Sequence, residues 1–130
     1  MRRDVLVHVR RGDEYLVVHR VPAKGGYWHT VAGGVEDGEE WEAAALRELR
    51  EETGLAAADV EPIGGFEYVR EDWEPEAGTH VTVRGFLADA EPGWEPDLNG
   101  EHDEYRWLGL DEACELIYWP EPRDLLRALA

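Results

Sequence analysis

Gly33 to Leu55 reads GGVEDGEEWEAAALRELREETGL, a glycine pair followed by a segment rich in helix-favouring residues. Its alanines and leucines favour helix, and Gly54 suits a left-handed cap at the helix end. We expect a helix over Glu39 to Thr53, capped at its start by Asp37 or Gly38. A stripe of apolar side chains along this helix predicts that it packs on a sheet.

Glutamates of the same expected helix form a cluster. Glu48, Glu51 and Glu52 sit at i, i+3 and i+4, which places them on one face, where like charges repel. A hard divalent cation reverses that balance, since Mg²⁺ and Mn²⁺ prefer oxygen ligands and substrate phosphates can complete the shell. The alternative is a solvated acidic face, which the glutamate-rich composition by itself favours. The glycines before the helix and the neighbouring Arg47 favour the metal site.

Length and composition predict one domain, residues 1–130, around one core. Hydrophobic residues make up 43% of the chain, as in ordinary globular proteins. No apolar run approaches ~18 residues, so we expect no membrane span. Cys114 is the single cysteine, and the start of the chain lacks the features of a signal peptide. We therefore expect a cytoplasmic protein without an internal disulfide.

The charge of the chain restricts its partners. Thirty acidic residues outnumber thirteen basic ones, for a formal net charge of −17. A general nucleic-acid binder needs a basic surface, and anionic membranes repel an acidic protein. We therefore expect neither partner. A small phosphate-bearing substrate is still compatible, because a bound cation and a few local arginines set the field inside a site.

Alternation and turn residues predict a mixed α/β fold. The expected strands cover 5–9, 15–19, 28–32, 63–70, 79–87 and 105–108, with further helices over 111–117 and 123–129. The turn at 11–14 predicts a hairpin, and Gly64-Gly65 predicts a bulge. Asp111 is the expected cap of the second helix. A mixed sheet between helices follows.

The glutamate cluster and its flanks resemble the signature of the Nudix hydrolases. That signature is Gly, five residues, Glu, seven residues, Arg-Glu, an aliphatic residue, any residue, Glu-Glu, any residue, Gly and an aliphatic residue. The matching positions here are Gly33, Glu39, Arg47, Glu48, Leu49, Glu51, Glu52, Gly54 and Leu55. The resemblance implies a Nudix-type α/β/α sandwich with a mixed central sheet. It also implies Mg²⁺-dependent hydrolysis, with Mn²⁺ able to substitute, of a nucleoside diphosphate linked to another group.

The resemblance also implies roles for individual residues. Glu48, Glu51 and Glu52 are implied metal ligands, with Glu51 also a candidate to position or deprotonate the water. The carbonyl of Gly33 is a further candidate ligand. Arg47 is expected to orient a glutamate, since an Arg–carboxylate pair fixes rotamers.

Outside the signature, the stretch EHDEYRWL offers a loop carboxylate. Glu101 is the candidate for a further metal ligand or general base, with Glu104 as the alternative. His102 could contact phosphate or be an ordinary surface histidine. Glu39, within the signature, is expected to satisfy backbone N–H groups of the loop before the helix.

Substrate contacts are less defined by the sequence. Aromatic rings at Tyr27, Trp28, Tyr68 and Trp73 could stack on a base, or could be packing residues. Arg20 is the first candidate for a phosphate contact, because its fork suits phosphate oxygens, with Arg70 and Arg84 as alternatives. Trp41, Trp107 and Trp119 are expected to be structural, and Cys114 to lie in the core.

Several functions stay open. Residues 27–36 and 101–108 resemble the dihydroneopterin triphosphate pyrophosphatase branch, and a (d)NTP is another candidate substrate. ADP-ribose and diadenosine polyphosphate branches are less favoured, because their additional marks are missing. A nucleotide-sensing module without turnover is the non-enzymatic alternative, and a decapping-type RNA enzyme is disfavoured by the charge. The resemblance also implies a homodimer.

Overall fold

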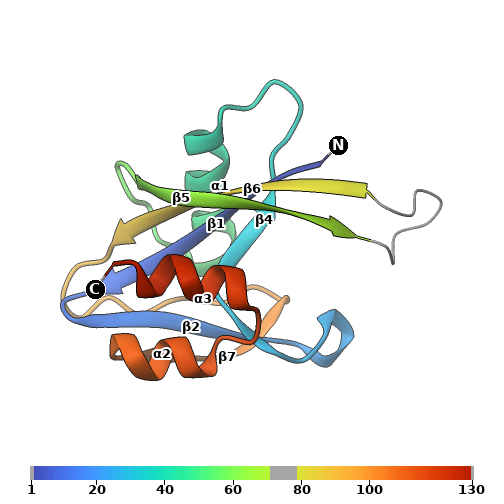
Figure 1. Cartoon of the computed structure of the whole chain (residues 1–130). Helices are drawn as coiled ribbons and strands as arrows, with labels where there is room; N and C mark the ends of the chain where they lie inside the picture. The colour runs from blue at the N-terminus through green and yellow to red at the C-terminus, as the bar shows by residue number, and fades with distance from the viewer. Residues whose placement is uncertain (1, 71–78, 130) are drawn as a thin grey trace.

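The computed structural model describes residues 2–70 and 79–129, and Figure 1 shows how a mixed sheet runs through them. The predicted stacking residue Trp73 lies outside the described residues. The strands are β1 (Arg2–Arg11), β2 (Glu14–Arg20), β3 (Trp28–His29), β4 (Val31–Gly34), β5 (Glu61–Arg70), β6 (Thr79–Asp89) and β7 (His102–Leu108). The helices are α1 (Trp41–Thr53), α2 (Leu110–Leu116) and α3 (Pro120–Arg127), with a 3-10 turn η1 (Pro22–Lys24).

Strand β1 is the centre of the sheet in the described part of the chain. It runs parallel to β6 and antiparallel to β2 and β4, and the order along the sheet is β3-β2-β1-β6-β5. Strand β4 adds to β1, and β7 adds to β2. The parallel pair makes the sheet mixed, as the sequence predicted. Since β1 joins both halves, it positions β4 beside α1.

Helices cover both faces of the sheet, which confirms the predicted α/β/α sandwich. Ala44, Ala45 and Leu49 of α1 are buried in one cluster with the valines of β1 that face them. Helices α2 and α3 bury Cys114 and Leu126 in a second cluster on the other face. The alternation along β1 allows this arrangement, because successive side chains point to opposite faces.

Helix α1 begins at Trp41, two residues later than predicted. Gly38 has a left-handed φ of 77°, and Glu40, which is the N-cap, is extended at φ −73° and ψ 153°. The carboxylate of Glu39 accepts a hydrogen bond from the backbone N–H of Glu36 at 3.0 Å, as predicted for this residue. The expected cap at Asp37 or Gly38 was therefore wrong. At the other end Gly54 adopts the predicted left-handed cap, with φ 82°.

Other element boundaries also differ from the prediction. The expected strand 28–32 is two short strands, because β3 pairs with β2 and β4 pairs with β1. Thr30 between them donates its hydroxyl to the carbonyl of Val7 at 2.7 Å. Gly109, and not Asp111, is the N-cap of α2. Helix α3 begins at Pro120, since proline is well suited to a first helical turn. The predicted bulge is confirmed by a register shift between Pro62 and Gly64.

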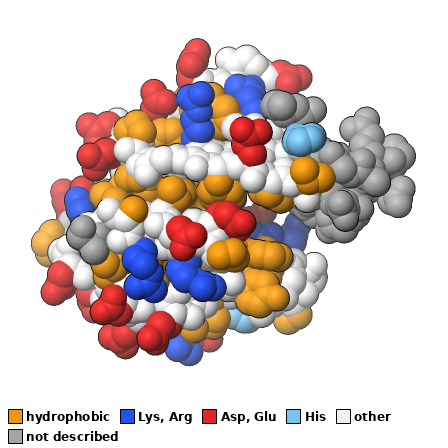
Figure 2. All heavy atoms as spheres, in the orientation of Figure 1, with side chains coloured by type: hydrophobic (Ala, Val, Ile, Leu, Met, Phe, Trp, Pro, Cys, Tyr) orange, Lys and Arg blue, Asp and Glu red, His pale blue; other side chains and the backbone are white. Residues whose placement is uncertain are grey.

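The surface reflects the acidic composition. Figure 2 shows acidic side chains spread over the visible face, with fewer basic ones between them. Within the described ranges, no helix has both the length and the apolar character needed to cross a membrane. Hydrophobic side chains gather near the junction of α2 and α3 in the same view. The exposed aromatic residues of that junction are Tyr118, at 60% exposure, and Trp119, at 45%.

Candidate metal and active site

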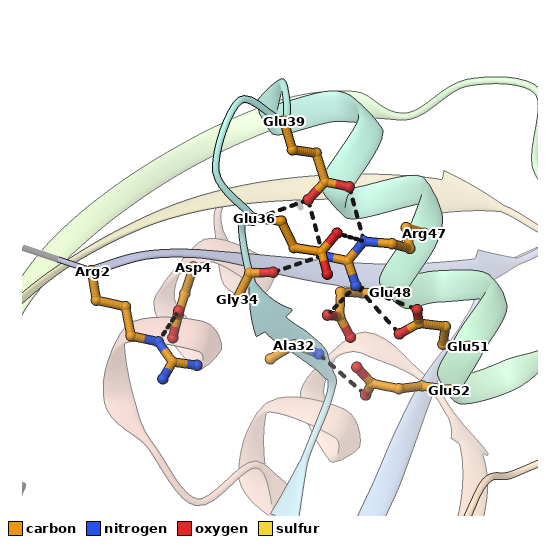
Figure 3. Close-up of polar contacts among 10 residues, drawn as sticks. All are labelled: Arg2, Asp4, Ala32, Gly34, Glu36, Glu39, Arg47, Glu48, Glu51 and Glu52. Carbon is orange, nitrogen blue, oxygen red and sulfur yellow. Dashed lines mark hydrogen bonds and ion pairs between the residues drawn. The ribbon is translucent and has the colours of Figure 1, made fainter.

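Glu48 and Glu52 of α1 point towards β4, as Figure 3 shows. Glu52 is the most enclosed of them, with 1% of its surface exposed, because it lies on the same helix face as the buried Leu49. Its Oε1 accepts a long hydrogen bond, 3.4 Å, from the backbone N–H of Ala32. Its Oε2 is buried without a hydrogen-bond partner among the described residues. A buried carboxylate oxygen of this kind needs a cation or a proton.

Gly33 and Glu48 fit against each other. A Cβ placed on Gly33 would collide with the carboxylate carbon and both carboxylate oxygens of Glu48. The glycine therefore leaves the room in which this carboxylate lies beside β4. From the sequence, a different reason for a glycine was expected here, namely that its carbonyl is a metal ligand. Both reasons can hold at once.

Arg47 holds the carboxylates around it in place. Its Nε and Nη2 donate to the two oxygens of Glu39 at 2.8 and 3.0 Å. Its Nη1 donates to Glu48 at 2.8 Å and, more weakly, to the exposed Glu51 at 3.3 Å. Nη2 also donates to the carbonyl of Gly34 at 2.8 Å. Arg47 thus ties α1 to the preceding loop, which is the orienting geometry expected of it.

The charges of this group shift its pKa values in opposite directions. Hydrogen bonds from Arg47 lower the pKa of Glu39 from 4.5 to about 2. Burial, reinforced by the neighbouring Glu48 and Glu101, raises the pKa of Glu52 well above its usual range. These opposite shifts indicate different roles, since Glu39 is a fixed anion and Glu52 is an anion only with a cation nearby.

Glu101, which directly precedes β7, and His102, the first residue of β7, complete the group. One oxygen of Glu52, one oxygen of Glu101 and one ring nitrogen of His102 all lie within 4.8 Å of one another. His102 is 4% exposed, so it is not the surface histidine that the sequence left as one alternative. Burial and the neighbouring Arg20 lower its pKa from 6.5 to about 4. The alternative carboxylate, Glu104, is instead within 3.3 Å of the exposed Arg106.

These residues fit a divalent cation. Glu52 supplies an unpaired buried oxygen, Glu48 a clamped carboxylate, and Glu101 a half-buried one. Oxygen donors of this kind suit Mg²⁺ or Mn²⁺. Glu51, with 53% of its side chain exposed, lies at the solvent side of the cluster.

An aromatic group adjoins the cluster. The ring of Tyr27 lies 5.8 Å from that of His29, 5.5 Å from Tyr118 and 5.9 Å from Trp119, measured between centroids. The Arg20 guanidinium lies 5.7 Å from the Tyr27 centroid, and Arg20 pairs with His102 across β2 and β7. We call Tyr27, Tyr118 and Trp119 the aromatic wall.

Several predicted substrate contacts lie elsewhere. Trp28 packs edge-on against His19, with Arg106 over its ring at 4.7 Å. Tyr68 belongs to a separate cluster that includes Phe66 of the same strand. The guanidinium of Arg84 lies 4.4 Å from the ring of Trp41, which favours a packing role. Arg70 lies in β5, and its side chain is outside what the structure describes.

Sequence reasoning missed two parts of this region. Trp119 was expected to be structural but is 45% exposed, and Tyr118 was not considered. The adjacent pair in YWPEP, just before a proline-started helix, was the available signal. His8 and His29 were also missed, and both are buried, with burial lowering their pKa values to about 4 and about 3. Their alternating strand context gave no sign of this.

Comparison with known proteins agrees with the fold. The NUDIX domain model matches residues 1–129. The asymmetrical bis(5'-nucleosyl)-tetraphosphatase of Mus musculus is 39% identical over 102 residues, which cover 78% of this chain and 68% of that protein. The NAD-capped RNA hydrolase NudC of Mannheimia succiniciproducens is 35% identical over 130 residues, covering 96% of this chain but 45% of that protein.

Solved structures share the architecture. The E. coli dihydroneopterin triphosphate pyrophosphohydrolase superposes with a TM-score of 0.82 at 24% identity, covering 97% of this chain and 92% of that one. A C. elegans Ap4A hydrolase in a binary complex gives a TM-score of 0.78 at 23% identity, covering 99% and 95%. At these identities the likeness concerns the fold alone.

Proposed function

This chain belongs to the Nudix family of hydrolases, and we propose that it cleaves a phosphoanhydride bond of a nucleoside polyphosphate with a divalent cation held between α1 and β7. The observation that carries the proposal is the unpaired, buried Oε2 of Glu52 beside Glu48 and Glu101. Three carboxylates converge there without a described cationic side chain that reaches Glu52. A metal ion supplies the missing positive charge.

Different residues of the site have different roles in the proposed reaction. Glu48, Glu52 and Glu101, with the carbonyl of Gly33 as a further donor, would hold the cation. The bound cation would supply screening of the diphosphate and activation of the attacking water. Arg47 fixes Glu48 and Glu51 before substrate arrives, so that little reorganisation is needed on binding. Water adds to phosphorus, and the anhydride oxygen leaves with the departing phosphate. Glu101 or Glu51 accepts the proton of that water.

The aromatic wall and Arg20 are the proposed substrate contacts. Arg20 is half-buried at the end of β2, where its Nε donates to the carbonyl of Lys24 at 3.1 Å. This bond leaves the terminal nitrogens of its fork to reach a phosphate. Tyr118 and Trp119 offer exposed ring faces on which a base can stack.

A dinucleoside tetraphosphate is the first candidate substrate. The sequence by itself disfavours diadenosine compounds, because the additional marks of that branch are missing. The tetraphosphatase relative now raises that ranking, since it is 39% identical and matches 68% of its own length. Dihydroneopterin triphosphate is the second candidate, on the short motifs at 27–36 and 101–108. A dinucleotide offers two bases, which suits a wall with two exposed rings, Tyr118 and Trp119.

The alternative function is nucleotide binding without turnover. Such a module does not need a complete set of signature carboxylates, yet Glu48, Glu51 and Glu52 are all present here. Arg47 also keeps Glu48 and Glu51 aligned, an ordering that binding alone does not require. These observations favour hydrolysis.

The proposal is tested by a substrate panel with Mg²⁺ and with excess chelator. The panel contains diadenosine tetraphosphate, dihydroneopterin triphosphate, 8-oxo-dGTP, ADP-ribose and an NAD-capped RNA. We expect Mg²⁺-dependent cleavage, fastest for diadenosine tetraphosphate, and loss of about 10³-fold in Glu52→Gln. The matched control is Glu42→Gln, an exposed residue of the same helix, which should keep wild-type rates.

The outcomes separate the functions. Tight binding of a nucleotide without cleavage under Mg²⁺ or Mn²⁺ would establish the sensing module instead. Fastest cleavage of the capped RNA would move the substrate class to RNA ends, against the expectation from the net charge of −17. Full activity in Glu52→Gln would remove the proposed metal site.

A further inference from the structure

His102 brings a nitrogen donor into the carboxylate group. Its Nε2 lies 4.0 Å from Oε1 of Glu52, and the donor atoms of Glu52, Glu101 and His102 all fall within 4.8 Å of one another. Two ligands about 2.1 Å from one ion are roughly 3 to 4 Å apart, so a shift of less than about 1 Å closes this set on a cation. Among the described residues, these three have donor atoms close enough together to hold one metal ion.

The imidazole of His102 is left without polar contacts. Neither Nδ1 nor Nε2 has a hydrogen-bond partner among the described residues, and no part of the side chain is exposed. Burying polar nitrogens without partners is unfavourable, and native proteins avoid it. A cation on Nε2 would remove part of this cost for His102 and also pair the free Oε2 of Glu52.

The backbone around His102 is fixed by its neighbours. The N–H of Glu101 donates to the side chain of Asn99 at 3.0 Å, and its carbonyl accepts from Val21 at 3.0 Å. His102 then enters β7 opposite Arg20, where the register of β2 and β7 shifts. Bulges of this kind re-aim side chains next to active sites. His102 lies at this bulge, and its Nε2 is 4.0 Å from Oε1 of Glu52.

We propose that Glu52, Glu101 and His102 form a mixed oxygen–nitrogen site that binds a divalent transition-metal ion, with Mn²⁺ or Co²⁺ preferred over Mg²⁺. The inference rests on the proposed metal role of Glu52 and Glu101 and adds the class of cation. Imidazole is a good ligand for first-row transition metals, whereas Mg²⁺ keeps oxygen ligands and waters. Glu48, clamped by Arg47, remains available to an oxygen-only Mg²⁺ position beside it.

The test is electron spin echo spectroscopy of the Mn²⁺-loaded full chain. A directly bound imidazole nitrogen gives a ¹⁴N modulation, which we expect in the wild type and which ¹⁵N-histidine labelling should replace by the ¹⁵N pattern. Labelling leaves the protein unchanged, so this readout does not depend on a variant folding. His102→Gln should lose the modulation. His80→Gln, at an exposed strand position, is the matched control and should keep it.

Metal titration calorimetry supplies the second readout. We expect His102→Gln to weaken Mn²⁺ binding by at least about tenfold and Mg²⁺ binding much less. Equal weakening of both ions would make His102 a packing residue and overturn the proposal. A wild-type spectrum without nitrogen coupling would overturn it too, as would coupling lost in His29→Gln but kept in His102→Gln. If Mg²⁺-dependent hydrolysis and its loss in Glu52→Gln still hold, only the nitrogen ligand is refuted.

Discussion

The carboxylate of Glu48 lies directly over the Cα of Gly33, in the space where any other residue would carry its Cβ. One strand residue and one helix residue therefore define a single position for this carboxylate, with Arg47 holding it from the far side at 2.8 Å. The missing side chain of Gly33 and the hydrogen bond from Arg47 together fix the position of the Glu48 carboxylate. This relationship leads to the first prediction.

Gly33→Ala should disable hydrolysis more than it destabilises the fold. The new Cβ displaces the Glu48 carboxylate, and a misplacement of about 1 Å can reduce rates roughly a hundredfold. Steady-state kinetics with Mg²⁺, alongside urea unfolding, would measure both effects. Gly34→Ala is the control, because its Cβ would come 3.2 Å from the flexible end of Arg2. Equal losses in the two variants would contradict this account of Gly33.

Arg47→Lys should reduce both stability and metal affinity. Lysine keeps the charge but cannot donate simultaneously to Glu39, Glu48 and the carbonyl of Gly34. Loss of these charge-assisted hydrogen bonds should lower the free energy of unfolding by about 2 kcal/mol. Urea titration measures this value, and calorimetry measures Mg²⁺ affinity. Arg50→Lys, exposed on the same helix, should change neither, and an unchanged Arg47→Lys would show that the network is dispensable.

His8 should make the protein less stable in mild acid. Its Nε2 lies 2.9 Å from the carbonyl of Pro122, and burial lowers the pKa of this histidine from 6.5 to about 4. The unfolded chain therefore takes up this proton at higher pH than the folded chain. The contribution of His8 is complete above pH 6.5 and falls by up to about 1.4 kcal/mol per pH unit as the pH drops towards 4.

Urea unfolding between these pH values would measure that slope. His8→Gln keeps a donor for Pro122 but cannot titrate, so its stability should depend less steeply on pH than that of the wild type. His80→Gln, at an exposed position, should retain the full slope. Parallel slopes in wild type and His8→Gln would show that His8 is not the group responsible.

Substitutions in the aromatic wall should change substrate affinity without changing the rate of the chemical step. Stacking a base on one ring contributes about 1–3 kcal/mol, so Trp119→Ala or Tyr118→Ala should raise KM about tenfold with kcat little changed. The comparison is Val69→Ala, since Val69 is also exposed, at 43%, but lies on β5. A fall in kcat with unchanged KM would place these rings outside the base site.

Local sequence determined the helix that carries the glutamates, its glycine cap, the hairpin at 11–14, the bulge near Gly64 and the layered α/β/α class. Each depends on side-chain periodicity or on backbone conformations that glycine favours, and both are readable over a few residues. The signature also brought Arg47 and the three glutamates together, because they are neighbours on one helix. Helix starts were less predictable. Glu39 lies before α1, where its carboxylate accepts a hydrogen bond from Arg47, and it is not part of the first helical turn.

The surroundings of Glu52 follow from the tertiary fold and not from local sequence. Its burial, its contact with His102 and the meeting of Tyr27 with Tyr118 and Trp119 join segments separated by many residues along the chain. A pKa depends on desolvation and on neighbouring charges, which are fixed when the sheet places β4 beside α1 and His102, at the start of β7, beside Glu52. The carboxylates could therefore be identified from the sequence, whereas the packing of the fold determined that Glu52 has a buried oxygen without a hydrogen-bond partner.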